Sequence, residues 1–254
     1  MCQRCGDALD VLSGQFPENS NVQMAALCRA CRLAPPPFER AISYGPYAGK
    51  LRDLIHALKY DRLRPVATKL GEMLARAIMQ LARDVPDEML VVPVPLHRSK
   101  NADRGFNQAR LLASEAIASL RKSRPGWHLT LAPSTLMRLR VTESQAGLTP
   151  RQRRLNVRGA FGISNPAAVA GKHVLLVDDI LTTGATARAA ARALLDAGAE
   201  SVWVATVARA RLRSPGSALA SATTEDAASV PSTNIETELP FKHATMNSLN
   251  QPSF

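Results

Sequence analysis

The stretch Val174–Thr186, which reads VLLVDDILTTGAT, decides the fold class of this chain. Its leading apolar run shows no polar alternation, which is typical of a strand buried on both faces of a parallel sheet. The segment 185–197 is rich in Ala, Leu and Arg and ends before Gly198, which predicts a helix. The apolar segment Ser201–Val207 predicts the next strand. Ligands of parallel sheets bind beyond the carboxyl ends of the strands, which is where the intervening loop lies.

That loop carries groups that suit a phosphorylated ligand. Threonine hydroxyls and backbone N–H groups at a helix N-terminus make a seat for a phosphate, and a glycine permits close approach of the backbone. Two adjacent carboxylates just upstream suit the hydroxyls of a ribose, or a Mg²⁺ that a ribose and a pyrophosphate share. A simpler interpretation is that the carboxylates only end the strand and cap the helix. The candidate binding residues are Asp178, Asp179, Thr182, Thr183, Gly184, Ala185 and Thr186.

The pattern Asp-Asp-x-x-Thr-Thr-Gly-x-Thr after an apolar strand resembles the phosphoribosyl pyrophosphate (PRPP) signature of type I phosphoribosyltransferases. The resemblance implies an α/β fold with a parallel sheet and helices on both faces. A Walker A loop is excluded because no Gly-Lys-Ser/Thr follows the strand. A dinucleotide-binding fingerprint is excluded because the chain has no G-x-G-x-x-G.

The composition limits the classes of function. The chain has 254 residues, enough for one large or two small domains, and it has no apolar run of about 18 residues that would span a membrane. Its net charge of +11 indicates polyanionic partners, either nucleic acid or phosphorylated small molecules. Aromatic residues make up only 4 %, so an extended base-stacking platform is not expected. The N-terminus lacks an apolar secretory segment, so we expect a cytoplasmic protein.

The cysteines form two C-x-x-C pairs near the start of the chain. A structural zinc site needs four ligands in a tetrahedron, and two such pairs separated by a loop have the usual spacing. Reduced thiols or a redox-active pair are the alternatives. Because two pairs are present and no cysteine is left over, the pattern favours a Cys₄ zinc ribbon with ligands Cys2, Cys5, Cys28 and Cys31.

The middle of the chain alternates between apolar strands and amphipathic helices. We expect one short strand or a hairpin over 38–47, strands over 89–94 and 129–136, and helices over 51–60, 65–81 and 109–120. A basic loop follows the strand that ends near Val94, and its Arg98 and Lys100 suit the charge of a pyrophosphate.

No side chain of these segments stands out as a catalytic base, so the catalytic residues stay unassigned. His97 is interpreted as a loop residue, and His56 and Lys59 as members of a solvated helix face. The polar stretch Arg138–Arg158 is long for a loop inside a compact domain, and such loops often form a lid over a binding site. Its end, 151–158, also fits a solvated charged helix.

The order of the motifs resembles the ComF family, in the ComFC/GntX-like branch of the phosphoribosyltransferase-like proteins. The motifs are the paired cysteines, LIHALKY at 54–60, VPVPLH at 92–97, RGFNQ at 104–108, the arginine-rich segment 138–145 and the PRPP loop. The resemblance covers Met1 to about Arg211. It implies a zinc-bearing N-terminal region fused to a type I phosphoribosyltransferase core, with a role in natural transformation and in handling single-stranded DNA.

Carried over by position, Asp178 and Asp179 face the ribose and Mg²⁺, and Thr182 to Thr186 face the 5′-phosphate. We therefore expect a zinc knuckle over 1–37, a phosphoribosyltransferase-like domain over 38–213 and a disordered tail over 214–254, which is rich in Ser, Thr, Ala and Asn. Two functions remain open. One is a transferase that displaces pyrophosphate from PRPP, and the other is a non-catalytic DNA-binding accessory factor that works with competence proteins.

Overall fold

The computed structural model describes residues 1–9, 27–61, 63–96, 105–140, 152, 157 and 159–210. By its internal contacts the chain divides into Met1–Leu212 and Arg213–Phe254, and all described residues belong to the first unit. The expected tail, Arg98 and Lys100, and most of the expected lid lie outside the described residues. No described helix is long and apolar enough to cross a membrane.

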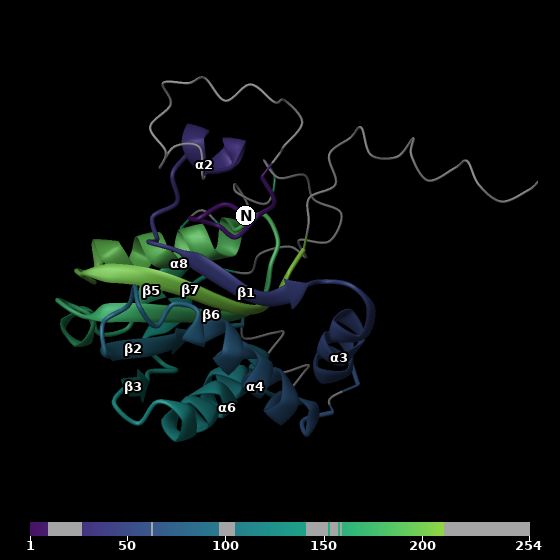
Figure 1. Ribbon diagram of the computed structural model, residues 1–254. Coiled ribbons are helices and arrows are strands. Elements are labelled where there is room, and N and C mark those ends of the chain that lie inside the picture. Colours follow the sequence, from purple (N-terminus) through teal and green to yellow (C-terminus); the bar gives the residue numbers. More distant parts are fainter. Residues whose placement is uncertain are drawn as a thin grey trace, which may run out of the picture. The chain divides into compact units, whose positions relative to one another are not determined.

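A five-stranded parallel sheet with the order β1-β7-β6-β2-β3 forms the centre of the molecule (Figure 1). The two long inner strands bury nearly every residue, because helices cover both of their faces. The strands are β1 (Ala41–Pro46), β2 (Glu88–Pro93), β3 (His128–Leu131), β6 (His173–Leu181) and β7 (Ser201–Arg209).

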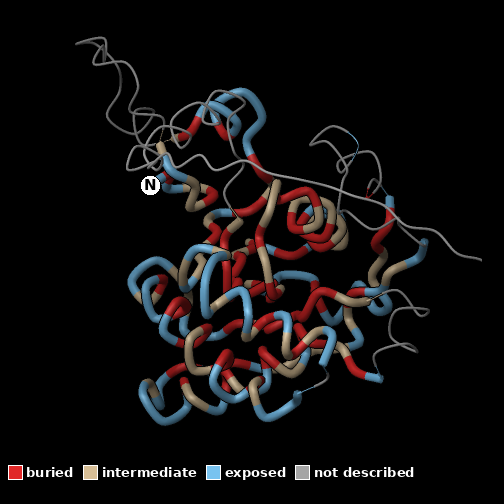
Figure 2. The backbone as a smooth tube through the Cα atoms, turned by 90° about the vertical axis from the view of Figure 1, so that its right-hand side faces the viewer, coloured by how far each residue is buried: buried red, intermediate tan, exposed pale blue. Residues whose placement is uncertain are grey.

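The helices divide between the two faces of this sheet. On one face α3 (Gly49–Lys59), α4 (Val66–Met79) and α6 (Gln108–Ser123) enclose one apolar core, and on the other α8 (Ala185–Asp196) encloses a second. Figure 2 shows the buried residues concentrated on the inner strands and the facing sides of the helices. This arrangement confirms the α/β fold class that the apolar runs predict. The short helix α2 (Arg29–Leu33) and the 3₁₀ turn η1 (Pro166–Ala168) lie outside this layered core.

The chain order within the sheet defines where a ligand fits. After β2 the chain moves outward to β3, and after β6 it moves outward in the opposite direction to β7 and away from β2. Neighbouring β2 and β6 therefore form a topological switch point, where loops leave in opposite directions and open a crevice. The loop after β6 is the predicted phosphate loop, so the fold places it beside this crevice.

The strand expected over 129–136 is wrong. The structure has β3, which ends at Leu131, and a separate strand β4 (Leu136–Arg138), with a turn between them. Pro133 lies in that turn and has no N–H for a ladder, so a continuous strand is interrupted there. β4 pairs antiparallel with β5 (Phe161–Ile163), a strand that the sequence pattern did not indicate.

The opening strand is longer than its apolar run. β6 continues through both aspartates to Leu181, because Asp178, Ile180 and Leu181 stay in register with β7. The apolar run by itself ends at Val177, and the pairing with β7 extends the strand so that both carboxylates lie on it. Their backbone is thereby held by the sheet.

Candidate functional site

The phosphate loop links β6 directly to the N-terminus of α8. Gly184 is the N-cap residue of that helix and has a φ of 73°, a left-handed conformation that favours glycine. The Thr183 hydroxyl oxygen accepts the Ala185 N–H at 3.3 Å, so this side chain caps the loop itself. The turn directs further N–H groups of the first helical turn outward, which is the usual arrangement for an anion site.

A pocket of about 410 Å³ lies at this strand end. It brings together most of the candidate residues with residues that the motif did not include, among them the polar side chains of Tyr47, Lys59 and Tyr60. Thr183 does not line the pocket, since its hydroxyl serves as the cap described above. The candidates that line it are Asp178, Asp179, Thr182, Gly184, Ala185 and Thr186.

Asp179 is held by residues from two other elements. Its Oδ2 accepts the Lys59 Nζ of α3 at 2.7 Å and the Gln108 Nε2 of α6 at 3.0 Å. The side chains of Asp179 and Lys59 are only 7 % and 15 % exposed, so this ion pair is largely shielded from water. Three helices or strands therefore fix one carboxylate in one orientation.

Asp178 has a different environment. Its Oδ1 accepts the backbone N–H of Asp179 at 2.9 Å. Burial and the adjacent charge of Asp179 raise the pKa of Asp178 to about 7, against the opposing effects of Lys59, the Asp179 N–H and Arg138. The two neighbouring carboxylates thus differ. Asp179 is paired with a cation at 2.7 Å, whereas burial and the charge of Asp179 favour the protonated form of Asp178.

The interpretation of Lys59 as a solvated helix residue is wrong. Periodicity places it near the polar side of α3, but the helix docks so that its last turn reaches the end of β6. The sequence signal available was its position inside the LIHALKY motif. Gln108 was noted only as part of RGFNQ, and its role becomes visible once α6 is seen to begin beside β6.

The RGFNQ motif also anchors its helix. The Asn107 amide donates to the Val94 carbonyl at 3.0 Å, and its side-chain oxygen accepts the Arg110 N–H at 3.3 Å. Asn107 is therefore the N-cap of α6 and ties the helix start to the end of β2. This contact fixes where Gln108 meets Asp179.

The four cysteines form a compact cluster. Their sulfurs all lie within 4.8 Å of one another, and the Cys5 and Cys28 sulfurs are 3.6 Å apart. Tetrahedral zinc with Zn–S bonds near 2.3 Å requires sulfurs about 3.8 Å apart, so the cluster fits a metal ion such as zinc. A hydrogen bond from Cys31 lowers the pKa of Cys5 to about 5 and raises that of Cys31. One thiol is thus readily deprotonated, as metal binding requires.

Two arginines attach this cluster to the sheet. The Arg4 guanidinium donates to the Phe38 carbonyl at 2.8 Å, and its own carbonyl accepts the Ala41 N–H at 2.7 Å. From β7, Arg209 forms an ion pair with Asp7 at 3.0 Å and reaches the Cys5 sulfur at 3.8 Å. The N-terminal cluster therefore packs on the edge of the sheet at β1 and β7.

Comparisons with known proteins agree with this architecture. Residues 107–239 match the model of the phosphoribosyl transferase domain. The chain is 34 % identical over 208 residues to the DNA utilization protein YhgH of Escherichia coli K12, covering 80 % of this chain and 82 % of that protein. It is 28 % identical over 188 residues to competence protein F of Haemophilus influenzae, covering 72 % and 78 % respectively.

A further relative is the competence protein ComFC of Bacillus subtilis. Its identity is 39 % over 114 residues, which is 44 % of this chain and 41 % of that protein. The domain match begins at Asn107, within the RGFNQ motif, and covers the phosphate loop, and the YhgH match spans most of both chains. The resemblance drawn from the motifs is thereby confirmed, and the chain belongs to the ComF family of phosphoribosyltransferase-like proteins.

Proposed function

We propose that the pocket at the end of β6 binds PRPP together with Mg²⁺, in a protein that serves the handling of DNA. The observation that carries the proposal is the fixed Asp179 carboxylate beside the helix N-terminus of α8. A carboxylate held by Lys59 and Gln108 is preorganised to accept ribose hydroxyls, while the loop N–H groups face a phosphate.

Charge distribution supports a polyanionic ligand here. Lys59 offsets the charge of Asp179, and a raised pKa leaves Asp178 partly protonated near neutral pH. Two uncompensated carboxylates would repel phosphates. The pairing of one carboxylate and the partial protonation of the other reduce that repulsion in this pocket. PRPP brings its own Mg²⁺, which would supply positive charge next to Asp178 and favour its ionised form. Both carboxylates fit the role of contacting the ribose hydroxyls or that Mg²⁺.

We also propose that the residues outside the described ranges complete the site. Arg98 and Lys100 follow β2, the other strand of the switch point, and would meet the pyrophosphate. Arg138 on β4 lies near enough to Asp178 to lower the pKa of that carboxyl, so the start of the expected lid reaches the site. A closing lid would exclude water from the ribosyl centre.

The metal of the cysteine cluster is proposed to be zinc with a structural role. All four cysteines are buried, and the Arg4 carbonyl beside them accepts a hydrogen bond from Ala41 at the start of β1. A bound ion would therefore hold the N-terminal 37 residues to the domain. This function needs no open coordination position, because four thiolates fill the tetrahedron.

A role with DNA is proposed from the relatives and the charge. One relative is named a DNA utilization protein and two are named competence proteins. The net charge of +11 suits a polyanion, and we expect binding of single-stranded DNA that weakens steeply as salt rises. The accessory-factor alternative, without catalysis, stays open because no lining residue is assigned as a base.

Calorimetry with PRPP and Mg²⁺ tests the proposed ligand. We expect binding to the unmodified protein, and weaker binding of ribose 5-phosphate, which lacks the pyrophosphate. Asp179→Asn removes a charged hydrogen-bond acceptor and should weaken PRPP binding by roughly ten- to a hundredfold. Thr186→Val should weaken it less, because backbone N–H groups still hold the phosphate.

Asp196→Asn at the exposed end of α8 is the matched control and should leave affinity unchanged. Because Asp179 is buried, each variant is first checked for folding by near-UV circular dichroism. Absence of heat with the unmodified protein would overturn the ligand. Unchanged affinity in a folded Asp179→Asn protein would overturn only the role of that residue.

A further inference from the structure

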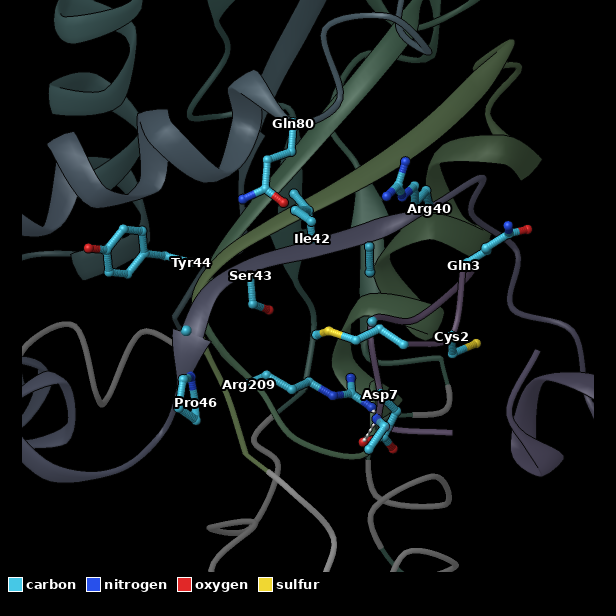
Figure 3. Close-up of a pocket in the computed structure, with 15 residues that line it drawn as sticks. Cys2, Gln3, Asp7, Arg40, Ile42, Ser43, Tyr44, Pro46, Gln80 and Arg209 are labelled. Atoms are coloured by element: carbon cyan, nitrogen blue, oxygen red, sulfur yellow. Dashed lines mark hydrogen bonds and ion pairs between the residues drawn. The ribbon is translucent and has the colours of Figure 1, made fainter. Parts of the chain in front are cut away.

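A second pocket lies at the opposite edge of the sheet from β3. It shares no lining residue with the PRPP pocket, but its Pro46 and Arg209 directly adjoin Tyr47 and Ala210 of that pocket. The second pocket has a volume of about 400 Å³ and is enclosed by the N-terminal cluster, the edge strand β1, Gln80 at the end of α4, and Arg209 (Figure 3). Its lining includes the apolar side chains of Ile42 and Pro46, together with a small number of polar groups. Such a mixture is typical of a site for a small, mostly apolar ligand.

Arg209 is the unusual group in this pocket. It is only 8 % exposed, and Figure 3 shows its side chain extended from β7 toward Asp7 alongside β1. The Arg209 Nη2 group forms an ion pair with Asp7 and donates a hydrogen bond to the Cys5 sulfur. The Nε and Nη1 atoms are buried and have no hydrogen-bond partner among the described residues. Buried donors of this kind are costly unless an acceptor reaches them.

The acceptor that would satisfy the Nε and Nη1 groups of Arg209 is expected to be neutral. The charge of Arg209 is already balanced by Asp7, and the adjacent cysteine cluster gains negative charge when it holds a metal. A phosphate or carboxylate placed here would be repelled by both. A carbonyl or ring nitrogen accepts the same N–H groups without bringing a charge.

The free edge of β1 is too short to receive a peptide strand. Its beginning is covered, because the Ala41 N–H donates to the Arg4 carbonyl, and its end returns to the sheet, because the Tyr47 N–H donates to the Arg209 carbonyl. Pro46, between them, has no N–H. The remaining open edge around Ser43 offers backbone groups to a small planar molecule only.

Two arginines adjoin the pocket, and each is paired with an exposed carboxylate, Arg40 with Asp84 and Arg4 with Glu39. Arg40 and Gln3 line this pocket and also a neighbouring hollow of about 680 Å³, whose wall includes Trp203 and Arg4. Arg40 pairs with Asp84 at 2.7 Å, but both side chains are at least a third exposed, and such pairs exchange readily for other anions. A phosphate can therefore displace Asp84 from Arg40 at the rim of the pocket.

We propose that the β1-edge pocket binds a base of single-stranded DNA, with the Arg209 N–H groups donating to acceptors of the base. The base would lie against Ile42 and Pro46 and meet the open peptide groups near Ser43. Its phosphates would contact Arg40 at the rim. The inference rests on the proposed role with DNA, and it makes that role specific for unpaired bases rather than for phosphates alone.

The test uses two labelled oligonucleotides of about ten nucleotides in fluorescence anisotropy at low salt. One is oligothymidylate, and the other carries the same number of phosphates on abasic sugars. We expect the unmodified protein to bind the thymidylate roughly tenfold more tightly, since loss of base contacts typically changes affinity by about five- to a hundredfold.

Two variants address the pocket itself. Arg209→Lys keeps the positive charge beside Asp7 but loses the Nε and Nη1 donors, and Gln80→Trp fills the pocket from the end of α4 without touching the cysteines. Each should reduce the difference between the two oligonucleotides to about twofold or less. Met79→Trp adds the same side chain one position earlier, where it faces a different hollow, and should keep the full difference.

The outcomes separate this inference from the proposed function. Equal binding of both oligonucleotides by the unmodified protein would overturn the base pocket and leave a phosphate-based role with DNA. An undiminished difference in folded Gln80→Trp protein would show that the pocket has an occupant other than a base. If neither oligonucleotide binds, the result would contradict both the proposed role with DNA and the base pocket. PRPP binding, measured in Gln80→Trp and Met79→Trp, should not change, because neither residue lines the PRPP pocket.

Discussion

Replacement of Lys59 by methionine tests the central contact of the candidate site. The substitution keeps a long apolar side chain but removes the cation that lies 2.7 Å from Asp179 Oδ2. At an effective dielectric constant of about 20, that attraction amounts to roughly 6 kcal/mol before desolvation is subtracted. Loss of one partner of a buried pair costs about 3–5 kcal/mol. Because Gln108 still donates to the carboxylate, we expect a loss near 3 kcal/mol in the free energy of unfolding.

Urea unfolding followed by circular dichroism measures this loss, and Lys69→Met is the matched control. Lys69 also pairs with a carboxylate, Glu72 at 3.1 Å, but those side chains are 60 % and 45 % exposed. An exposed pair of this type contributes about 0.5 kcal/mol or less. The double variant with Lys59→Met and Asp179→Asn should recover much of the stability, because it no longer leaves a buried charge without its cation.

The cost of Lys59→Met should also depend on pH. Lys59 helps to keep the pKa of Asp178 from rising further, so its removal strengthens proton uptake by Asp178 in the folded state. The destabilisation should therefore be largest near pH 8 and shrink below about pH 4, where the carboxyls are protonated. Equal stability of Lys59→Met and Lys69→Met at pH 8 would refute the reasoning, as would a double variant no more stable than the single one.

Three further predictions follow from other parts of the structure. A folded-state pKa of about 7 for Asp178 means that unfolding free energy falls as pH rises from about 4 to 7, by at most about 4 kcal/mol; urea titrations of unliganded protein should show a smaller slope in Asp178→Asn. Metal analysis should find about one zinc ion per chain, and Cys28→Ser should make the N-terminal region sensitive to protease, with an unchanged digestion pattern counting against a structural metal. Gly71→Ala should cost about 1–3 kcal/mol, because its methyl group would lie 2.2 Å from Glu115 Cβ where α4 meets α6, whereas Gly126→Ala, with open space around it, should not; equal melting temperatures would contradict that helix contact.

Several features of this protein follow from the sequence by itself, since they depend on neighbouring residues. The unbroken apolar run before Asp178 is compatible only with a strand covered on both faces, and the structure shows β6 in the middle of the sheet. Gly184 at the helix start and the paired cysteines are likewise local patterns, and each lies in the structure as its pattern predicted. The patterns themselves are local, although the two cysteine pairs, 23 positions apart between Cys5 and Cys28, meet only in the folded chain.

Other features were decided by tertiary contacts. Lys59 and Gln108 precede Asp179 by 120 and 71 positions, and their roles arise only because α3 and α6 dock with particular ends against β6. Helical periodicity says which side of a helix is apolar, but not which polar residue at its end meets another element. The burial of Asp179 is a further example, since a carboxylate at a strand end was expected to face solvent.

The antiparallel pair β4–β5 and the environment of Arg209 were also beyond local patterns. Each of these short strands has three residues, which is too few to show alternation, and 22 residues, 139–160, separate them in the chain. Arg209 ends an apolar strand and reads as a surface cation, but the N-terminal cluster packs over it and leaves part of its guanidinium buried without an acceptor. Local spacing thus determined the elements and the candidate ligand-binding motif. The docking of distant segments decided the burial, ion pairs and hydrogen bonds of the side chains in the two pockets.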